Sequence, residues 1–148
     1  MAEVGAREIR IDHVFDAPRD AVFSAWIDPD QIARWWAPGG LEVPRETVEI
    51  EARVGGAFRL TMVESGGGAR LSIRGDFVEI NPPELIVLRL EPITEAIPDV
   101  TITRVVFEAD GERTRMTLTT GPYTDEMRPY AAAGWGESLA NLDRLLAS

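Results

Sequence analysis

Residues 129–146 read PYAAAGWGESLANLDRLL, and this stretch predicts a long helix near the end of the chain. Trp135, Leu139, Leu142 and Leu146 recur at the spacing of a single helical face, and Leu145 widens the apolar stripe. A helix with such a stripe needs an apolar surface to pack against. The segments that precede it show what that surface is.

Those segments predict an antiparallel sheet. Between residues 47 and 121 apolar and polar residues alternate in short runs, as at Phe58, Leu60 and Met62, and turns that contain glycine or proline separate the runs. An earlier strand at residues 8–16 precedes two short helices that begin near Pro18 and Pro29. We therefore expect an α+β fold in which a curved antiparallel sheet wraps around the terminal helix, with residues 1–148 as a single domain.

The phase of each strand predicts which side chains point outward. Taken with the apolar residues inward, seven arginines share the outer phase: Arg59, Arg70, Arg74, Arg89, Arg104, Arg113 and Arg115. We interpret them as a solvated charged face. The inward phase includes Glu46 and several threonines, and Gly75 predicts a bend or bulge in its strand.

The composition excludes several classes of function. A net charge of −10 argues against nucleic-acid binding, which depends on clustered basic side chains. The chain has no lysine, no cysteine and one histidine, His13, so Schiff bases, lysine-dependent phosphate loops, thiol nucleophiles and thiolate metal sites are excluded. No segment suits membrane insertion and the first residues lack the core of a signal peptide, so we expect a cytoplasmic protein.

Four stretches carry a resemblance to a known family. They read DAPRDAVFSAWIDPDQIARWWAPGG at 16–40, EARVGGAF at 51–58, RGDFVEINPPELIV at 74–87 and AGWGESLANLDRLL at 133–146. Together they resemble the homologues of the activator of the 90-kDa heat-shock-protein ATPase, a family of the START-like superfamily. Glu51 stands where the family often has Asp, and Val54 where proline is usual.

This resemblance implies a helix-grip fold with an internal cavity. Members of the superfamily bind lipids, sterols, polyketides or other apolar molecules, and some are cyclases. The chaperone activators themselves carry a further N-terminal domain that does much of the docking, so a chaperone partner is not expected here. We predict a small apolar or amphipathic ligand between the sheet and the terminal helix, with no cofactor and no metal.

Ten residues are candidates for contact with that ligand. They are His13, Trp35, Trp36, Phe58, Leu60, Met62, Phe77, Thr103, Tyr130 and Trp135. Trp35 and Trp36 are adjacent on a short helix, so they cannot face the same way. Gly134 and Gly136 inside the terminal helix have two open explanations, tight packing against the sheet or room for a ligand.

Two other functions remain open. A cyclase or hydrolase would use the same cavity, with His13, Glu46 or Tyr130 as acid or base. An interaction protein, such as a homodimer or a co-chaperone, would use the outer face of the sheet. His13 is otherwise interpreted as a hydrogen-bonded residue of the cavity wall.

Overall fold

The computed structural model of the chain describes residues 7–92 and 99–147. The strands are β1 (Ile9–Phe15), β2 (Leu41–Glu42), β3 (Glu49–Ile50), β4 (Ala57–Glu64), β5 (Arg70–Asn81), β6 (Leu85–Leu90), β7 (Thr101–Asp110) and β8 (Arg113–Gly121). The helices are α1 (Arg19–Ile27), α2 (Pro29–Trp35), the 3-10 helix η1 (Arg45–Thr47) and α3 (Arg128–Ala147).

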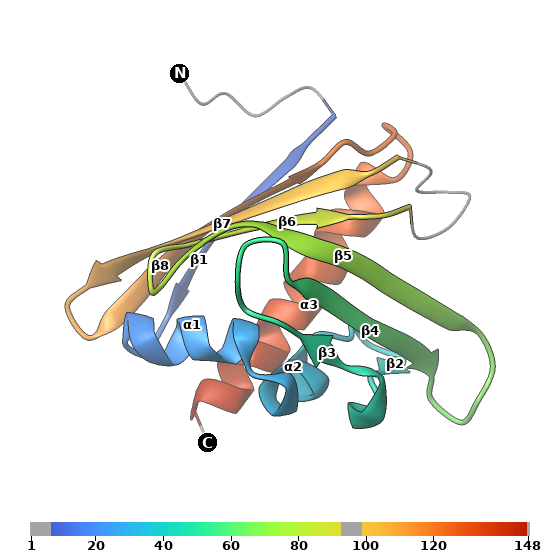
Figure 1. Cartoon of the computed structure of the whole chain (residues 1–148), viewed down its shortest axis with the longest axis horizontal. Helices are drawn as coiled ribbons and strands as arrows, with labels where there is room; N and C mark the ends of the chain where they lie inside the picture. The colour runs from blue at the N-terminus through green and yellow to red at the C-terminus, as the bar shows by residue number, and fades with distance from the viewer. Residues whose placement is uncertain (1–6, 93–98, 148) are drawn as a thin grey trace.

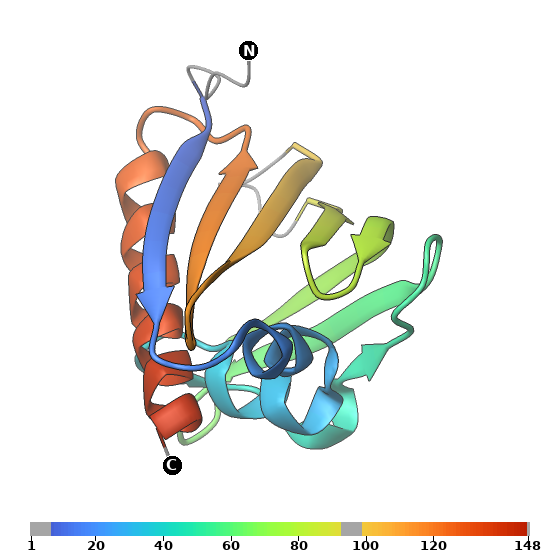
Figure 2. The ribbon, with the colours of Figure 1, turned by 90° about the vertical axis from the view of Figure 1, so that its left-hand side faces the viewer.

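The strands form one antiparallel sheet in the order β1-β8-β7-β6-β5-β4-β2, and β3 also pairs with β4. Consecutive hairpins connect β4 through β8, and β1 pairs with β8 along its whole length, from Ile9 opposite Thr120 to Phe15 opposite Thr114. Figure 2 shows the curvature of this sheet, with α3 beside β1. The α+β fold and the terminal helix expected from the sequence are confirmed.

The first two helices close one end of the curved sheet, between α3 and β4 (Figure 1). Pro18 precedes the first turn of α1, and α2 begins at Pro29, where the side chain of Asp28 accepts a hydrogen bond from the backbone N–H of Asp30 at 3.0 Å. Because Pro29 has no N–H, the carbonyl of Ala25 lacks its helical donor. The indole Nε1 of Trp35 donates to it instead, at 2.9 Å.

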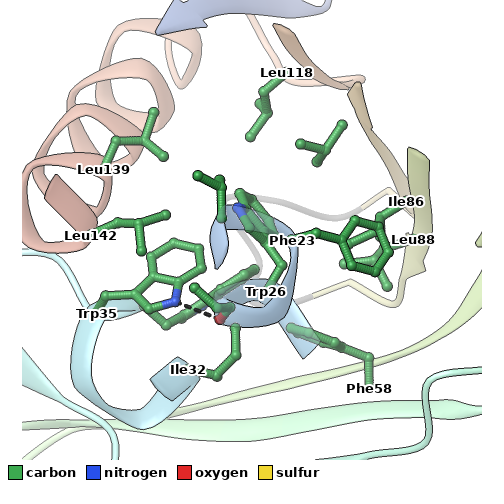
Figure 3. Packing of buried hydrophobic residues seen from close by; sticks show 14 of the residues in the cluster. Phe23, Trp26, Ile32, Trp35, Phe58, Ile86, Leu88, Leu118, Leu139 and Leu142 are labelled. Carbon is green, nitrogen blue, oxygen red and sulfur yellow. Dashed lines mark hydrogen bonds between the residues drawn. The ribbon is translucent and has the colours of Figure 1, made fainter. Parts of the chain in front are cut away.

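An aromatic and aliphatic core fills the space under these helices. Figure 3 shows Trp26 of α1, Trp35 of α2 and Leu142 of α3 converging there, with Phe58 of β4 and Leu118 of β8 on the sheet side. All five are buried. Burial of side chains of this size is the main stabilising contribution to such a fold.

The outer face of the sheet is charged, as the strand phase predicts. All seven arginines assigned to it are exposed, and several pair with carboxylates, such as Arg59 with Glu49 at 3.3 Å and Arg89 with Asp76 at 3.2 Å. Ion pairs at such exposed positions contribute little stability individually. Within the part of the chain that the structure describes, no helix combines the length and apolarity needed to cross a membrane.

One local prediction is wrong, and another is wrong in the place it gave to a bulge. Glu46 was expected to point inward on a strand, but it lies exposed on η1, because the backbone N–H and the hydroxyl of Thr47 both bond to the carbonyl of Pro44 and form a turn there. The bulge of β5 lies between Phe77 and Glu79, not at Gly75. Gly75 instead permits close strand approach, since a Cβ there would lie 2.1 Å from the carbonyl oxygen of Arg89.

Candidate functional site

A pocket of about 300 Å³ lies between the N-terminal half of α3 and the inner face of the sheet. This volume is at the lower end of the range for small-molecule sites. The described residues that line it are Trp36, Pro38, Leu41, Met62, Leu71, Ile73, Leu90, Thr101, Thr103, Tyr123, Met127, Tyr130, Ala131, Gly134, Trp135 and Ser138. None of these side chains carries a charge at neutral pH.

Along β4 and β7, inward residues near one end of the strand line the pocket, and those farther along belong to the core. On β4, Met62 lines the pocket, whereas Phe58 and Leu60 on the same face are buried in the core. On β7 the same change occurs between Thr103, which lines the pocket, and Phe107, which is part of the core. The helices α1 and α2 cover only one end of the sheet, so β4 and β7 each have a part that belongs to the core and a part that faces the pocket.

Two tryptophans form the aromatic wall of the pocket. The rings of Trp36 and Trp135 lie 5.2 Å apart at 75°, an edge-to-face arrangement. Trp135 also stacks on the buried Trp26, with ring centroids 5.9 Å apart at 19°. The two indoles that line the pocket are therefore held by the core behind them.

Polar anchors connect the C-terminal half of α3 to the end of α2. The buried hydroxyl of Ser138 donates to the carbonyl of Trp36 at 2.6 Å, and the amide of Asn141 donates to the carbonyl of Ala37 at 2.8 Å. These carbonyls follow the last turn of α2 and have no helical donor. The anchors position Trp36 against α3.

A row of hydroxyl groups forms the polar part of the pocket wall. The hydroxyls of Thr103 and Thr120 lie 2.8 Å apart, and Thr120 makes a longer contact of 3.4 Å with the phenol of Tyr123. Thr103 and Tyr123 line the pocket, while Thr120 lies behind them and is fully buried. Thr101, one inward position earlier on β7, adds a further hydroxyl to the lining.

The two glycines of α3 do not serve close packing. A Cβ added at Gly134 or at Gly136 would meet no atom within 4 Å outside the backbone of the helix itself. Gly134 lines the pocket, and Gly136 is exposed and does not. Of the two explanations left open by the sequence, tight packing against the sheet is therefore excluded.

The structure brings five of the ten candidate ligand contacts to the pocket and leaves five away from it. Those that line it are Trp36, Met62, Thr103, Tyr130 and Trp135. Those that do not are His13, Trp35, Phe58, Leu60 and Phe77. The last four are fully buried, because α1 and α2 cover that end of the sheet and their side chains fill it.

His13 has a contact of a different kind. Its Nε2 lies 3.0 Å from both carboxylate oxygens of Asp143, so β1 and α3 are joined by a hydrogen bond in which the imidazole N–H donates. This pair is partly exposed and lies outside the pocket lining. Neither His13 nor Glu46 is therefore placed as an acid or base for the pocket. Among residues 7–92 and 99–147, no three His, Asp or Glu side chains gather as metal ligands.

Several lining residues were not predicted. Leu71 and Ile73 share the inward phase of β5, and Leu71 pairs directly with Met62, so strand register would have identified them. Leu90 lies opposite Thr101 and would have been found in the same way. Tyr123 follows the end of β8 in a segment without periodicity, and no sequence signal marks it.

Comparisons with known proteins agree with this architecture. A family model described as Activator of Hsp90 ATPase homolog 1-like protein matches residues 16–147. A solved structure from Chromobacterium violaceum is similar with a TM-score of 0.86 and 26% identity, covering 96% of this chain and 98% of that one. The solved structure of the AHSA1 protein from Silicibacter pomeroyi, 24% identical, has a TM-score of 0.81 over 95% of this chain and 97% of its own. Among curated proteins there is no significant match.

Proposed function

Because the chain belongs to the family of Activator of Hsp90 ATPase homolog 1-like proteins, we propose that it binds a small apolar or amphipathic molecule in the pocket between the sheet and α3. The observation that carries this proposal is the absence of charge from the described lining, in a protein with 27% charged residues and a net charge of −10. An uncharged recess on such a surface favours an apolar occupant.

The side chains divide into three roles. Trp36 and Trp135 supply aromatic surface, and Met62 supplies a flexible apolar contact opposite them. Thr103 belongs to the row of hydroxyl groups in the wall, and this row would orient an amphipathic ligand. Tyr130, 69% exposed, stands at the rim and would cover part of a bound molecule.

A matched pair of helix variants tests the proposal. Gly134→Leu places an isobutyl group in the pocket, whereas Gly136→Leu places the same group on the exposed side of α3. The probe is N-phenyl-1-naphthylamine, a neutral dye whose fluorescence rises in apolar sites. We expect the wild type and Gly136→Leu to bind the dye, and Gly134→Leu to lose at least about tenfold in affinity.

Two results would contradict the proposal. One is a wild-type protein that leaves the fluorescence of the dye unchanged, and the other is a Gly134→Leu variant that binds the dye as well as Gly136→Leu does. Circular dichroism of both variants controls for folding. Native mass spectrometry of the protein as purified from cells would in addition reveal a retained ligand through its mass.

A further inference from the structure

We infer that the ligand of this pocket is a neutral molecule whose oxygen atom, of the ketone or amide type, accepts a hydrogen bond from the phenol of Tyr123. This inference rests on the proposed function and narrows it to one chemical class. It excludes carboxylic acids, which many apolar carriers bind as anions. Two independent observations carry it, the charge of the lining and the number of hydroxyl protons in the wall.

The first observation concerns charge. A ligand carboxylate or ammonium that entered the pocket would exchange water for aromatic, aliphatic and hydroxyl surface without meeting an opposite charge among the described lining residues. Burial of an unpaired ion is among the most unfavourable events in protein energetics. The lining therefore selects against ions of either sign.

The second observation concerns protons. Thr103, Thr120 and Tyr123 have one hydroxyl proton each, and the contacts between them use two. One proton is left over. If Thr120 kept the unused proton, a fully buried hydroxyl in the middle of the row would donate to nothing. A buried donor without an acceptor is energetically unfavourable. The spare proton therefore belongs to an end of the row.

The two ends of the row differ in access. Both residues line the pocket, but Thr103 is 0% exposed, whereas Tyr123 retains 8% of its surface. When Thr103 donates to Thr120 and Thr120 donates to Tyr123, the proton of the Tyr123 phenol remains available for a ligand. No other hydrogen bond of the Tyr123 phenol is found in the described part of the chain. A phenol is also a stronger donor than an alcohol, since it is the more acidic group.

The geometry gives the ligand a direction. Trp36 and Trp135 form the aromatic wall, and the Tyr123 phenol belongs to the hydroxyl row that β7 and β8 hold in place. A flat apolar body with one accepting oxygen at its edge would satisfy both surfaces at once. This is the usual organisation of small-molecule pockets, in which a few polar groups fix the orientation of an apolar ligand.

Three probes of one shape test the inference. They are 2-acetylnaphthalene, which is neutral and has an accepting oxygen, 2-ethylnaphthalene, which lacks the oxygen, and 2-naphthoate, which is an anion at pH 7. We expect the acetyl compound to bind roughly two- to tenfold more tightly than the ethyl compound, the typical effect of one hydrogen bond. Naphthoate should not bind at concentrations that saturate the protein with the acetyl compound.

A pair of tyrosine variants locates the donor. Tyr123→Phe should abolish the difference in affinity between the acetyl and ethyl compounds. Tyr130→Phe, which removes the phenol at the rim, should preserve the difference. Titrations followed by the indole N–H signals in nuclear magnetic resonance report both the affinity and the integrity of the fold. The comparison of the three probes on the wild-type protein remains valid even if a variant is unstable.

The outcomes separate this inference from the function beneath it. Equal affinity for the acetyl and ethyl compounds, or binding of naphthoate as tight as that of the ketone, would overturn the inference and leave an apolar pocket in place. A difference that persists in Tyr123→Phe would also overturn it. Failure of both neutral compounds to bind would count against the proposed function itself.

Discussion

Trp26 and Trp35 lie in the same buried aromatic cluster, with ring centroids 4.8 Å apart at 64°, but among the described residues only one of their indole N–H groups has an acceptor. Trp35 Nε1 donates to the carbonyl of Ala25 at 2.9 Å, the carbonyl that Pro29 leaves without a helical donor (Figure 3). Trp26 Nε1 finds no hydrogen-bond acceptor among the described residues. Although the two side chains are equally buried, among the described residues the indole N–H of Trp35 is hydrogen-bonded and that of Trp26 is not.

We predict that Trp35→Phe destabilises the protein more than Trp26→Phe, by about 1–2 kcal/mol. Both changes remove a similar volume, but the first leaves the carbonyl of Ala25 unpaired and the second removes a donor that has no partner among the described residues. The free energies of unfolding in urea measure the difference, and each variant serves as control for the other. Equal values, or a larger loss for Trp26→Phe, would mean that Trp26 Nε1 has an acceptor.

Substituting alanine for the helix glycines separates stability from binding. Gly136→Ala and Gly134→Ala should each raise the free energy of unfolding by about 0.5–1 kcal/mol, because alanine favours the helix and neither Cβ meets a neighbour within 4 Å. Only Gly134 lines the pocket, so only Gly134→Ala should weaken binding of the naphthalene dye. Thermal unfolding and dye titration check the two effects. A destabilised Gly136→Ala variant would be the contrary result.

Ser138 couples stability to the position of Trp36. Ser138→Ala leaves the carbonyl of Trp36 without its 2.6 Å hydrogen bond, so we expect a loss of about 1–3 kcal/mol in the free energy of unfolding. Binding of the dye should weaken as well, since Trp36 loses an anchor beside the pocket. Ser24→Ala, at an exposed position of α1, is the control and should change stability by less than about 0.5 kcal/mol. A similar small effect of Ser138→Ala would refute the coupling.

Acid stability should depend on Asp12, an exposed residue of β1. The hydrogen bond from the Arg10 guanidinium, with a second from the Thr117 hydroxyl, lowers the pKa of the Asp12 carboxyl below its ordinary value. A lowered pKa means that the ionised form stabilises the folded state. That contribution is present above about pH 4, the region of the unfolded pKa, and is lost as the pH falls through the folded pKa.

The comparison with Asp12→Asn tests this linkage. The stability difference between wild type and variant should be constant near neutral pH and should shrink below about pH 4, as chemical unfolding at a series of pH values would show. The effect will be small because the carboxyl is largely exposed. A difference that grows on acidification would have the wrong sign for a lowered pKa.

Much of the fold could be predicted from local patterns. The period of two along β4 correctly placed Phe58, Leu60 and Met62 on one face, and the spacing of Trp135, Leu139 and Leu142 correctly predicted α3. The family resemblance, which rests on the order of several motifs, is confirmed over residues 16–147. The assignment of ligand contacts stays a prediction, although five of its residues line the pocket.

Two assignments made by counting residues along one element do not match the structure. Glu46 was given an inward phase by counting along a strand that the turn at Pro44 interrupts. His13 was placed in the cavity wall by its phase on β1, but its partner is Asp143, 130 positions away on α3. Counting residues along one element cannot identify a partner on another.

The sequence by itself determined which face of each element is apolar, because side-chain direction follows from the backbone repeat of a strand or helix. Only the tertiary structure decided which part of that face is filled and which part is open. Phe58 and Met62 have the same phase on the same strand, yet Phe58 is buried in the core and Met62 lines the pocket. The place where a helix crosses a sheet depends on long-range packing, and that packing produces the pocket.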